Sequence, residues 1–176
     1  KRAGRWFLSV QCEINSAEPD RMPPKAALGV DLGIKHLAAV SDGRIYHNPK
    51  SLNKIERVLN RKQKEKCRRI KGSCNRLKTV ARLQEIYYIS SCIRKDALHK
   101  MTKDLVRTKP SLIVIEDLSV KNMLKNHKLA KSLSDASFGE ARRQIEYKAK
   151  WAGIDVVVAN RFYPSSKTCS RCGKVK

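Results

Sequence analysis

Two acidic residues lie in runs that are otherwise apolar. Asp31 stands in the run GVDLG, and Glu116 closes the run LIVIE. An unpaired charge buried in such a strand would cost several kcal/mol, so each carboxylate is either solvated on an open face or held there for a purpose. Two carboxylates that converge could hold Mg²⁺ (or Mn²⁺) against phosphate, because Mg²⁺ typically takes one or two carboxylates with water and phosphate oxygens. Such sites hydrolyse phosphodiester bonds.

The spacing of these acids leaves a structural alternative open. In that alternative, Asp31 starts a turn, and Glu116 or Asp117 caps a helix. The two interpretations differ in where the secondary-structure elements place the two acids.

A pair of cysteines near the end of the chain is the second candidate site. Cys169 and Cys172 are spaced to share one Zn²⁺ ion and are followed by Gly173, but a structural zinc site needs four ligands. The pair lies in a basic segment rather than at the helix start that redox motifs use. The other cysteines are scattered, which predicts reduced thiols rather than a disulfide framework: Cys12, Cys67, Cys74 and Cys92.

The charge of the chain points to a polyanionic partner. The 176 residues contain 39 Lys and Arg against 16 Asp and Glu, a net charge of +23. Nucleic acid is the first candidate, since Lys and Arg contacts release condensed counterions. A basic membrane-surface protein would need an amphipathic helix with an aromatic or Leu-rich face, and only 6% of the residues are aromatic. No apolar run is long enough to span a membrane. We expect no membrane partner and a location in the prokaryotic cytoplasm or nucleoid.

The segment 50–78 is the most basic part of the chain. It holds twelve Lys and Arg against two acids, Glu56 and Glu65. Solvated helix faces usually mix the two signs, so a face of one sign suits contact with phosphates. The residues that we predict to make these contacts are Lys62, Lys64, Lys66, Arg68 and Arg69.

Hydrophobic periodicity predicts the elements. Residues 6–14 alternate as a half-buried strand does, and the Pro-rich stretch that follows places a boundary near Pro24. Three short strands follow from residue 27, with bends at Gly33 and Asp42-Gly43.

Helices and two further strands complete the pattern. Helices are predicted over 51–70 and 75–107, the second with an apolar stripe that includes Ile89 and Ile93. A buried strand is predicted within SLIVIEDLSV, residues 111–120, followed by a loop over 121–135. Ser137 and Glu140 form a capping box that opens a third helix, Gly153 ends that helix, and a buried strand begins near residue 154.

The order of elements is that of a ribonuclease-H-like mixed sheet with flanking helices. In that α/β fold the first three strands form an antiparallel meander, and later strands join beside the first through helical crossovers. The strands that carry Asp31 and Glu116 are then parallel neighbours, so the two carboxylates should meet at one edge of the sheet. We assign residues 1–24 to a preceding module, 25–162 to the sheet domain with a helical insertion at about 51–108, and 163–176 to a tail that carries Cys169 and Cys172.

Several blocks of the chain resemble the TnpB (OrfB) family, the transposon-encoded relatives of the type V CRISPR nucleases. The blocks are GVDLGIKHLAAVS, VIEDLSVKNMLKNHKLAKSLSDASFGEARRQIEYKAKWAG and NRFYPSSKTCSRCGK, and they cover roughly residues 27 to 174. The resemblance implies that residues 25–162 form a RuvC-like nuclease domain in which Asp31 and Glu116 match the first two metal-binding catalytic acids. It also implies that residues 1–24 come from a preceding nucleic-acid-binding module and that residues 163–176 are the first half of a zinc ribbon. It further implies a Mg²⁺-dependent, RNA-guided DNA endonuclease with guide RNA and target DNA as partners.

Two departures from the family pattern affect these expectations. The family's third catalytic acid follows a second CxxC, whereas no Asp or Glu follows Asp155 here, and Asp155 matches nothing in the family block. Cys169 and Cys172 match only half of the family's four-Cys zinc ribbon, so Zn²⁺ is expected in the complete protein. Because the chain also starts with Lys, we expect it to be part of a longer protein.

Two alternatives to a nuclease remain. A catalytically inactive nucleic-acid-binding protein or transposon remnant would share the same charge. A ribosomal-type RNA protein would explain the charge but neither of the two strand-borne acids.

Overall fold

The structure is a computed structural model that describes residues 3–13, 26–160 and 172. One mixed sheet contains the strands β1 (Leu28–Leu32), β2 (His36–Val40), β3 (Ile45–His47), β4 (Leu112–Glu116) and β5 (Asp155–Ala159). The strand order is β3-β2-β1-β4-β5, in which β1, β2 and β3 are antiparallel, and β4 is parallel to both β1 and β5. The predicted meander and the placing of β4 beside β1 are confirmed, whereas β5 lies beside β4 rather than β1.

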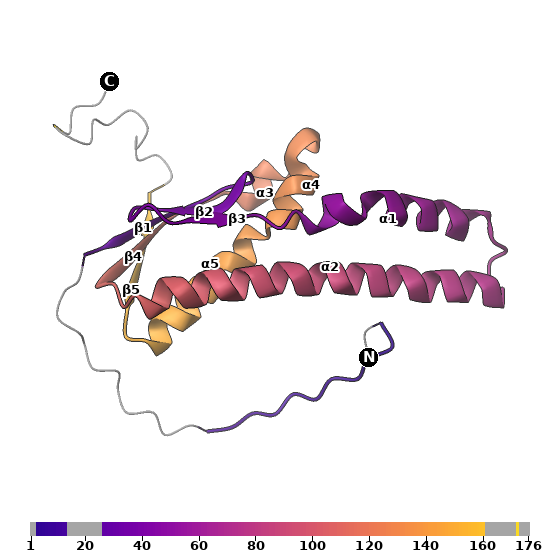
Figure 1. The fold of residues 1–176 in the computed structure, drawn as a ribbon, viewed down its shortest axis with the longest axis horizontal. Helices are drawn as coiled ribbons and strands as arrows, with labels where there is room; N and C mark the ends of the chain where they lie inside the picture. The colour runs from indigo at the N-terminus through magenta and orange to yellow at the C-terminus, as the bar shows by residue number, and fades with distance from the viewer. Residues whose placement is uncertain (1–2, 14–25, 161–171, 173–176) are drawn as a thin grey trace.

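The helices divide into a long hairpin and a shorter group. The hairpin is α1 (Ser51–Arg68) and α2 (Cys74–Arg107), close to the predicted bounds, and the others are α3 (Val120–Met123), α4 (His127–Ala136) and α5 (Phe138–Trp151). Gly72, with φ +87°, makes the turn of the hairpin, and the Ser73 side chain accepts a hydrogen bond from the Arg76 amide to cap α2. Figure 1 shows the hairpin reaching well beyond the sheet.

The core lies on one face of the sheet. Helices α2 and α5 cover that face, as Figure 1 shows. Along β1 and β4 every second side chain points into the core, since side chains alternate across a strand. The buried apolar residues include Val30, Ile113 and Ile115 from the sheet, Leu98, Met101 and Leu105 from α2, and Ala141, Ile145 and Ala149 from α5.

The opposite face of the sheet is more open in the part of the chain that the structure describes. Asp31, Ala39 and Glu116 are exposed there, and Val157 of β5 is 47% exposed. The prediction that β5 is a buried strand is therefore wrong. β5 is half-buried because, within the described ranges, it is the outermost strand and only β4 flanks it.

The predicted strand at the N-terminus is not formed over residues 6–13. The side chains of Trp6, Leu8 and Val10 are 80%, 90% and 70% exposed, although Phe7 contacts the ring of Tyr88 on α2. An alternating sequence becomes a strand only when a neighbouring strand accepts its backbone hydrogen bonds. No described strand of the sheet pairs with this segment.

The segment 121–135, predicted as a loop, is largely helical. It contains most of α3 and α4, and the Asn126 side chain caps α4 by accepting a hydrogen bond from the Lys128 amide at 3.1 Å. Leu133 of α4 is 1% exposed. The segment contains many polar residues, so its short amphipathic pattern was not recognised in the sequence. A helix of this length depends on tertiary packing for its stability.

Two finer predictions about the helices are also wrong. Ile89 and Ile93 of α2 are 49% and 40% exposed, because the two ends of this long helix pack against different partners, α1 and the sheet-bound α5. Helix α5 starts where predicted, but Ser137 has φ +55° and its hydroxyl donates to the Ser134 carbonyl rather than capping. The Glu140 side chain bonds Arg143 and Gln144 instead. None of the helices in the described ranges is both long and apolar enough to cross a membrane.

A buried carboxylate fastens the hairpin to the rest of the fold. Asp135 of α4 is 6% exposed, and it accepts hydrogen bonds from the Ser51 hydroxyl at 2.8 Å and the Leu52 amide at 3.1 Å. It also pairs with Arg94 of α2 at 3.3 Å, and Ser51 bonds Ser90 of α2. One side chain thus joins α1, α2 and α4.

Substitution of Asp135 should loosen this junction. We expect Asp135→Ala to lower the free energy of unfolding by about 2–4 kcal/mol, because it leaves buried donors and an Arg94 charge without their acceptor. The matched control is Glu56→Gln, which breaks the exposed pair of Glu56 with Lys131 that joins α1 and α4, and should cost less than about 1 kcal/mol. Chemical denaturation measures both, and equal losses would contradict the assignment.

Candidate metal and nucleic-acid site

The parallel pairing of β1 with β4 brings the two strand acids together. Val30 pairs with Ile115, so the next residue of each strand places Asp31 beside Glu116. Both side chains are exposed on the face opposite the core, and neighbouring strands lie about 4.8 Å apart. The two carboxylates can therefore converge on one ligand at the carboxyl ends of these strands.

Neither acid has the structural role that the alternative interpretation required. Asp31 lies within β1 rather than at its end, and the caps of α3 are Ser119 and Leu124 rather than an acid. In the part of the chain that the structure describes, neither Asp31 nor Glu116 forms an ion pair or a side-chain hydrogen bond. Two exposed, unengaged carboxylates on adjacent strands are available to a cation.

A cation that the sequence analysis missed contacts Asp117, the residue after Glu116. Arg142, in the first half of α5, contacts Asp117 at 3.3 Å and Glu146 at 2.8 Å. The Glu146 hydrogen bond raises the pKa of Arg142, and Asp117 adds to this effect. The spacing of four residues between Arg142 and Glu146 was visible in the sequence, but the contact with Asp117 depends on how α5 packs.

No third acid joins the pair within the described ranges. Asp155 opens β5 opposite Leu112, whereas the residue opposite Glu116 is Ala159, four residues and about 13 Å along the strand. The described residues hold no cluster of three or more His, Cys, Asp or Glu that could bind a metal. The imidazole rings of His36 and His47 lie close together, with centroids 5.6 Å apart, but these two groups alone do not form such a cluster.

The structure bears only in part on the cysteine predictions. Cys169 lies outside the described residues, and Cys172 is exposed. The predicted zinc pair therefore stays a prediction. The scattered cysteines are free thiols, as expected: Cys12, Cys67, Cys74 and Cys92.

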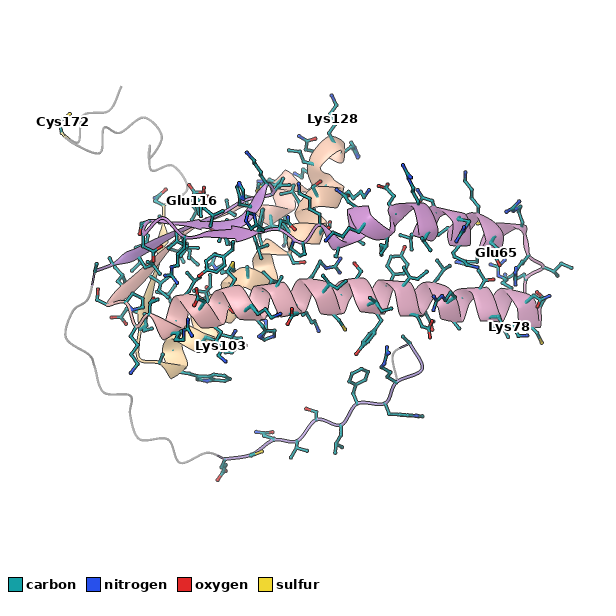
Figure 2. All side chains as sticks on the ribbon, viewed as in Figure 1. Glu65, Lys78, Lys103, Glu116, Lys128 and Cys172 are labelled. Atoms are coloured by element: carbon teal, nitrogen blue, oxygen red, sulfur yellow. The ribbon has the colours of Figure 1, made fainter. Side chains whose placement is uncertain are left out.

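Four of the five predicted phosphate-binding residues occupy different sides of α1, and Arg69 follows its last residue. The Lys62 ammonium bonds Glu65 at 2.7 Å, and Arg69 pairs with the same carboxylate. Glu65 lies between α1 and α2 near the far end of the hairpin (Figure 2), where it also accepts from Thr79 of α2 at 3.3 Å. The Lys62 hydrogen bond is the main reason that the pKa of Glu65 is lowered. Lys62 and Arg69 thus help to hold the hairpin closed.

The other side of α1 presents a line of exposed cations. Residues three and four apart lie on the same face of a helix. Within the described ranges, none of the cations on this face pairs with an acid. We name the set the basic stripe: Lys54, Arg57, Arg61, Lys64 and Arg68.

The basic stripe overlaps the prediction at Lys64 and Arg68. It spans 15 residues, or about 21 Å of helix from the first to the last. Of the remaining predicted residues, Lys66 is half-buried.

Comparison with known proteins identifies the chain. The model of the OrfB_IS605 family, described as "Probable transposase", matches residues 9–127. The chain belongs to this family. A second family model, "Cas12f1-like, TNB domain", matches residues 138–176 of this chain.

Two curated relatives match nearly the whole chain. A protein of Streptomyces pristinaespiralis named "Putative RNA-guided DNA endonuclease" is 41% identical over 99% of this chain and 43% of its own length. The Escherichia coli (strain K12) protein named "Putative RNA-guided DNA endonuclease InsQ" is 33% identical over 97% of this chain and 45% of its own length. The chain thus spans less than half the length of these relatives.

A solved structure shares the fold of this OrfB_IS605 protein. The Cas12f1 chain in a cryo-EM structure of a Cas12f1-sgRNA-target DNA complex matches with a TM-score of 0.56 at 16% identity, over 88% of this chain and 40% of that chain. The mixed α/β sheet and its helices are therefore a fold that Cas12f1 also has.

The exposed acids of this OrfB_IS605 protein should not stabilise the fold. We expect Asp31→Asn and Glu116→Gln to leave the free energy of unfolding unchanged within about 0.5 kcal/mol or to raise it, since two adjacent carboxylates repel each other. The control is Ile115→Val, at a neighbour that is 1% exposed, which should cost about 0.5–1.5 kcal/mol. A loss of a few kcal/mol for either acid, measured by denaturation, would make that acid a structural partner.

Proposed function

We propose that this chain is the RuvC-like, ribonuclease-H-like core of an RNA-guided DNA endonuclease associated with transposition. The observation that carries the proposal is the parallel register that sets Asp31 beside Glu116 on an open face of the sheet. The names of the relatives and the strand order β3-β2-β1-β4-β5 support it. Because the chain spans 43% of the first relative, the activity is that of the whole protein.

The donor set at the sheet edge suits Mg²⁺ or Mn²⁺. Asp31 and Glu116 supply hard oxygen ligands from rigid strands, and Mg²⁺ commonly takes one or two carboxylates and keeps its remaining positions for water and phosphate oxygens. Asp31 and Glu116 would hold the cation, which would supply an activated water and stabilisation of the leaving oxygen of the phosphodiester. Both carboxylates face solvent, so a phosphate group can reach them.

The basic surfaces suit the polyanion that this chemistry requires. The basic stripe of α1 offers unpaired cations to phosphate oxygens, and the described part of α1 carries no aromatic side chain for base stacking. We propose guide RNA and target DNA as the partners, as the names of the relatives and the sgRNA and target DNA bound to Cas12f1 suggest. In the complete protein, Cys169 and Cys172 would supply two of the four ligands of a zinc ribbon.

Cleavage by the protein with its guide RNA tests the nuclease assignment. We expect Mg²⁺-dependent cutting of a labelled duplex that matches the guide, and a loss of more than about 100-fold for Asp31→Ala or Glu116→Ala. Even residues that only orient metal ligands contribute about 10–100-fold. Binding of the guide and target should persist in both variants.

Retained binding without any cutting by the wild type would instead support the inactive nucleic-acid-binding protein. Cutting that survives both substitutions would overturn the assigned site. Mn²⁺-induced broadening of NMR signals from β1 and β4 gives a readout that does not depend on cleavage.

The basic stripe can be tested by the salt dependence of DNA binding. We expect Arg61→Gln with Lys64→Gln to reduce the slope of log K against log[salt] by about 1.8 for duplex DNA, since each phosphate contact contributes about 0.9. The matched control is Lys62→Gln with Arg69→Gln, which removes the same charge from the side of α1 that Glu65 engages. Fluorescence anisotropy from 50 to 200 mM salt measures both. A larger change for the control pair would place the interface on the other side of the helix.

A further inference from the structure

A cavity of about 360 Å³ lies where the turn after β1, the start of α1 and helix α4 meet. Ile34 and Lys35 reach it from the turn that follows β1, Lys50 and Asn53 from the start of α1, and Asp135 from α4. The turn after β1 starts two residues beyond Asp31, and α3 and α4 follow Glu116 in the chain. The cavity therefore opens at the same edge of the sheet as the two acids.

The walls of the cavity are fixed by hydrogen bonds. The Asn48 side chain donates to the Ile34 carbonyl at 2.9 Å and accepts from the Lys50 amide at 3.0 Å. These bonds join the turn after β1 to the segment that enters α1. Asp135 is held by Ser51, Leu52 and Arg94 on the other side. The cavity is thus formed before any ligand binds.

The charge of the cavity is positive. Lys35 and Lys50 are exposed, and neither pairs with an acid in the part of the chain that the structure describes. Asp135 is the acid among the lining residues, but it is 6% exposed and Arg94 compensates its charge. Asn53 lines the cavity with an amide that no described residue engages, and Leu129 adds apolar surface that is 44% exposed.

These features match one nucleotide of a nucleic-acid strand. The volume lies at the lower end of the range for small-ligand sites, about 300–1,000 Å³, which suits a single nucleotide unit. Two lysines can contact phosphate, an amide can bond the edge of a base, and an apolar side chain can cover its face. Lys54, the first residue of the basic stripe, follows Lys50 by four residues, so a strand along α1 would lead to the cavity.

We propose that this cavity binds one phosphorylated nucleotide, DNA or RNA, of a strand that runs from the basic stripe to the acidic pair. Lys35 and Lys50 hold its phosphates, and Asn53 contacts its base. The inference rests on the proposed nucleic-acid function and adds a defined nucleotide position to it.

The first test uses labelled oligo-dT and oligo-U as probes for DNA and RNA. We expect Lys35→Gln with Lys50→Gln to reduce the slope of log K against log[salt] by about 1.4, since each contact with a single strand contributes about 0.7. Between 50 and 200 mM salt, wild-type affinity should then fall about sevenfold more than that of the variant. The matched control is Lys103→Gln with Lys150→Gln on α2 and α5, and Figure 2 shows Lys103 on the side of α2 away from Glu116. Its slope should equal that of the wild type.

The outcomes separate this proposal from the function on which it rests. If the wild type binds with a steep salt dependence and the cavity variant keeps the same slope, the cavity proposal is overturned and the nucleic-acid function stands. If the wild type binds neither probe, both are overturned. A slope reduced with only one of the probes assigns the cavity to DNA or to RNA.

A second measurement tests whether a base enters the cavity. Thymidine 3′,5′-bisphosphate and uridine 3′,5′-bisphosphate should shift the NMR signals of the Asn53 side-chain amide, and Asn53→Ala should weaken their binding more than that of inorganic phosphate. Equal shifts with inorganic phosphate alone would overturn the nucleotide assignment. Unchanged signals with all three probes would overturn the site.

Discussion

The parallel hydrogen bonding of β1 with β4 is the constraint on which the other features of this protein depend. It sets Leu28 against Ile113 and Val30 against Ile115, so the apolar side chains of both strands fall on the same face. The core can then form only on that face, where α2 and α5 cover it. By the same alternation, Asp31 and Glu116 must lie together on the other face. A slip of one residue in the register would bury one of the acids and expose core side chains.

The hairpin of α1 and α2 depends on polar contacts at both of its ends. At its base, Asp135 joins α1, α2 and α4 through buried hydrogen bonds. At its tip, Glu65 accepts from Lys62, Arg69 and Thr79, so one carboxylate engages two of the many cations at this end of the hairpin. The basic stripe lies on the other side of α1, exposed and without an acidic partner among the described residues. The division between structural and available cations follows from which side of α1 faces α2.

In the proposed function, the acidic pair, the cavity and the basic stripe would together form a path for a nucleic-acid strand. The cavity shares its walls with the junction at Asp135, so the contacts that orient the hairpin also shape the cavity. A strand bound along α1 would reach the two carboxylates without crossing the face that the helices cover. Within the proposed endonuclease, binding of the strand along α1 and in the cavity would thus determine which phosphodiester bond lies at the two carboxylates.

The sequence by itself determined much of this fold and the identity of the strand acids. Alternating and helical periodicities located β1 to β5, the hairpin and α5, and the block LIVIE showed a charge where a buried strand should have none. The sequence pattern predicted the secondary structure less well in segments whose conformation depends on tertiary packing. Residues 6–13 alternate but find no partner strand within the described ranges, and the polar segment before Asp135 folds into α4 because Leu133 reaches the core.

Only the tertiary structure decided which charges are engaged. Lys62 and Lys64 look alike in the sequence, yet one bonds Glu65 and the other faces solvent, because two residues of helix turn a side chain by more than half a revolution. In the same way, the cavity that contains Lys35 and Lys50 exists only where three distant segments meet. Periodicity is a property of neighbouring residues and can be read from the sequence, whereas ion pairs and cavities depend on which surfaces the fold brings into contact.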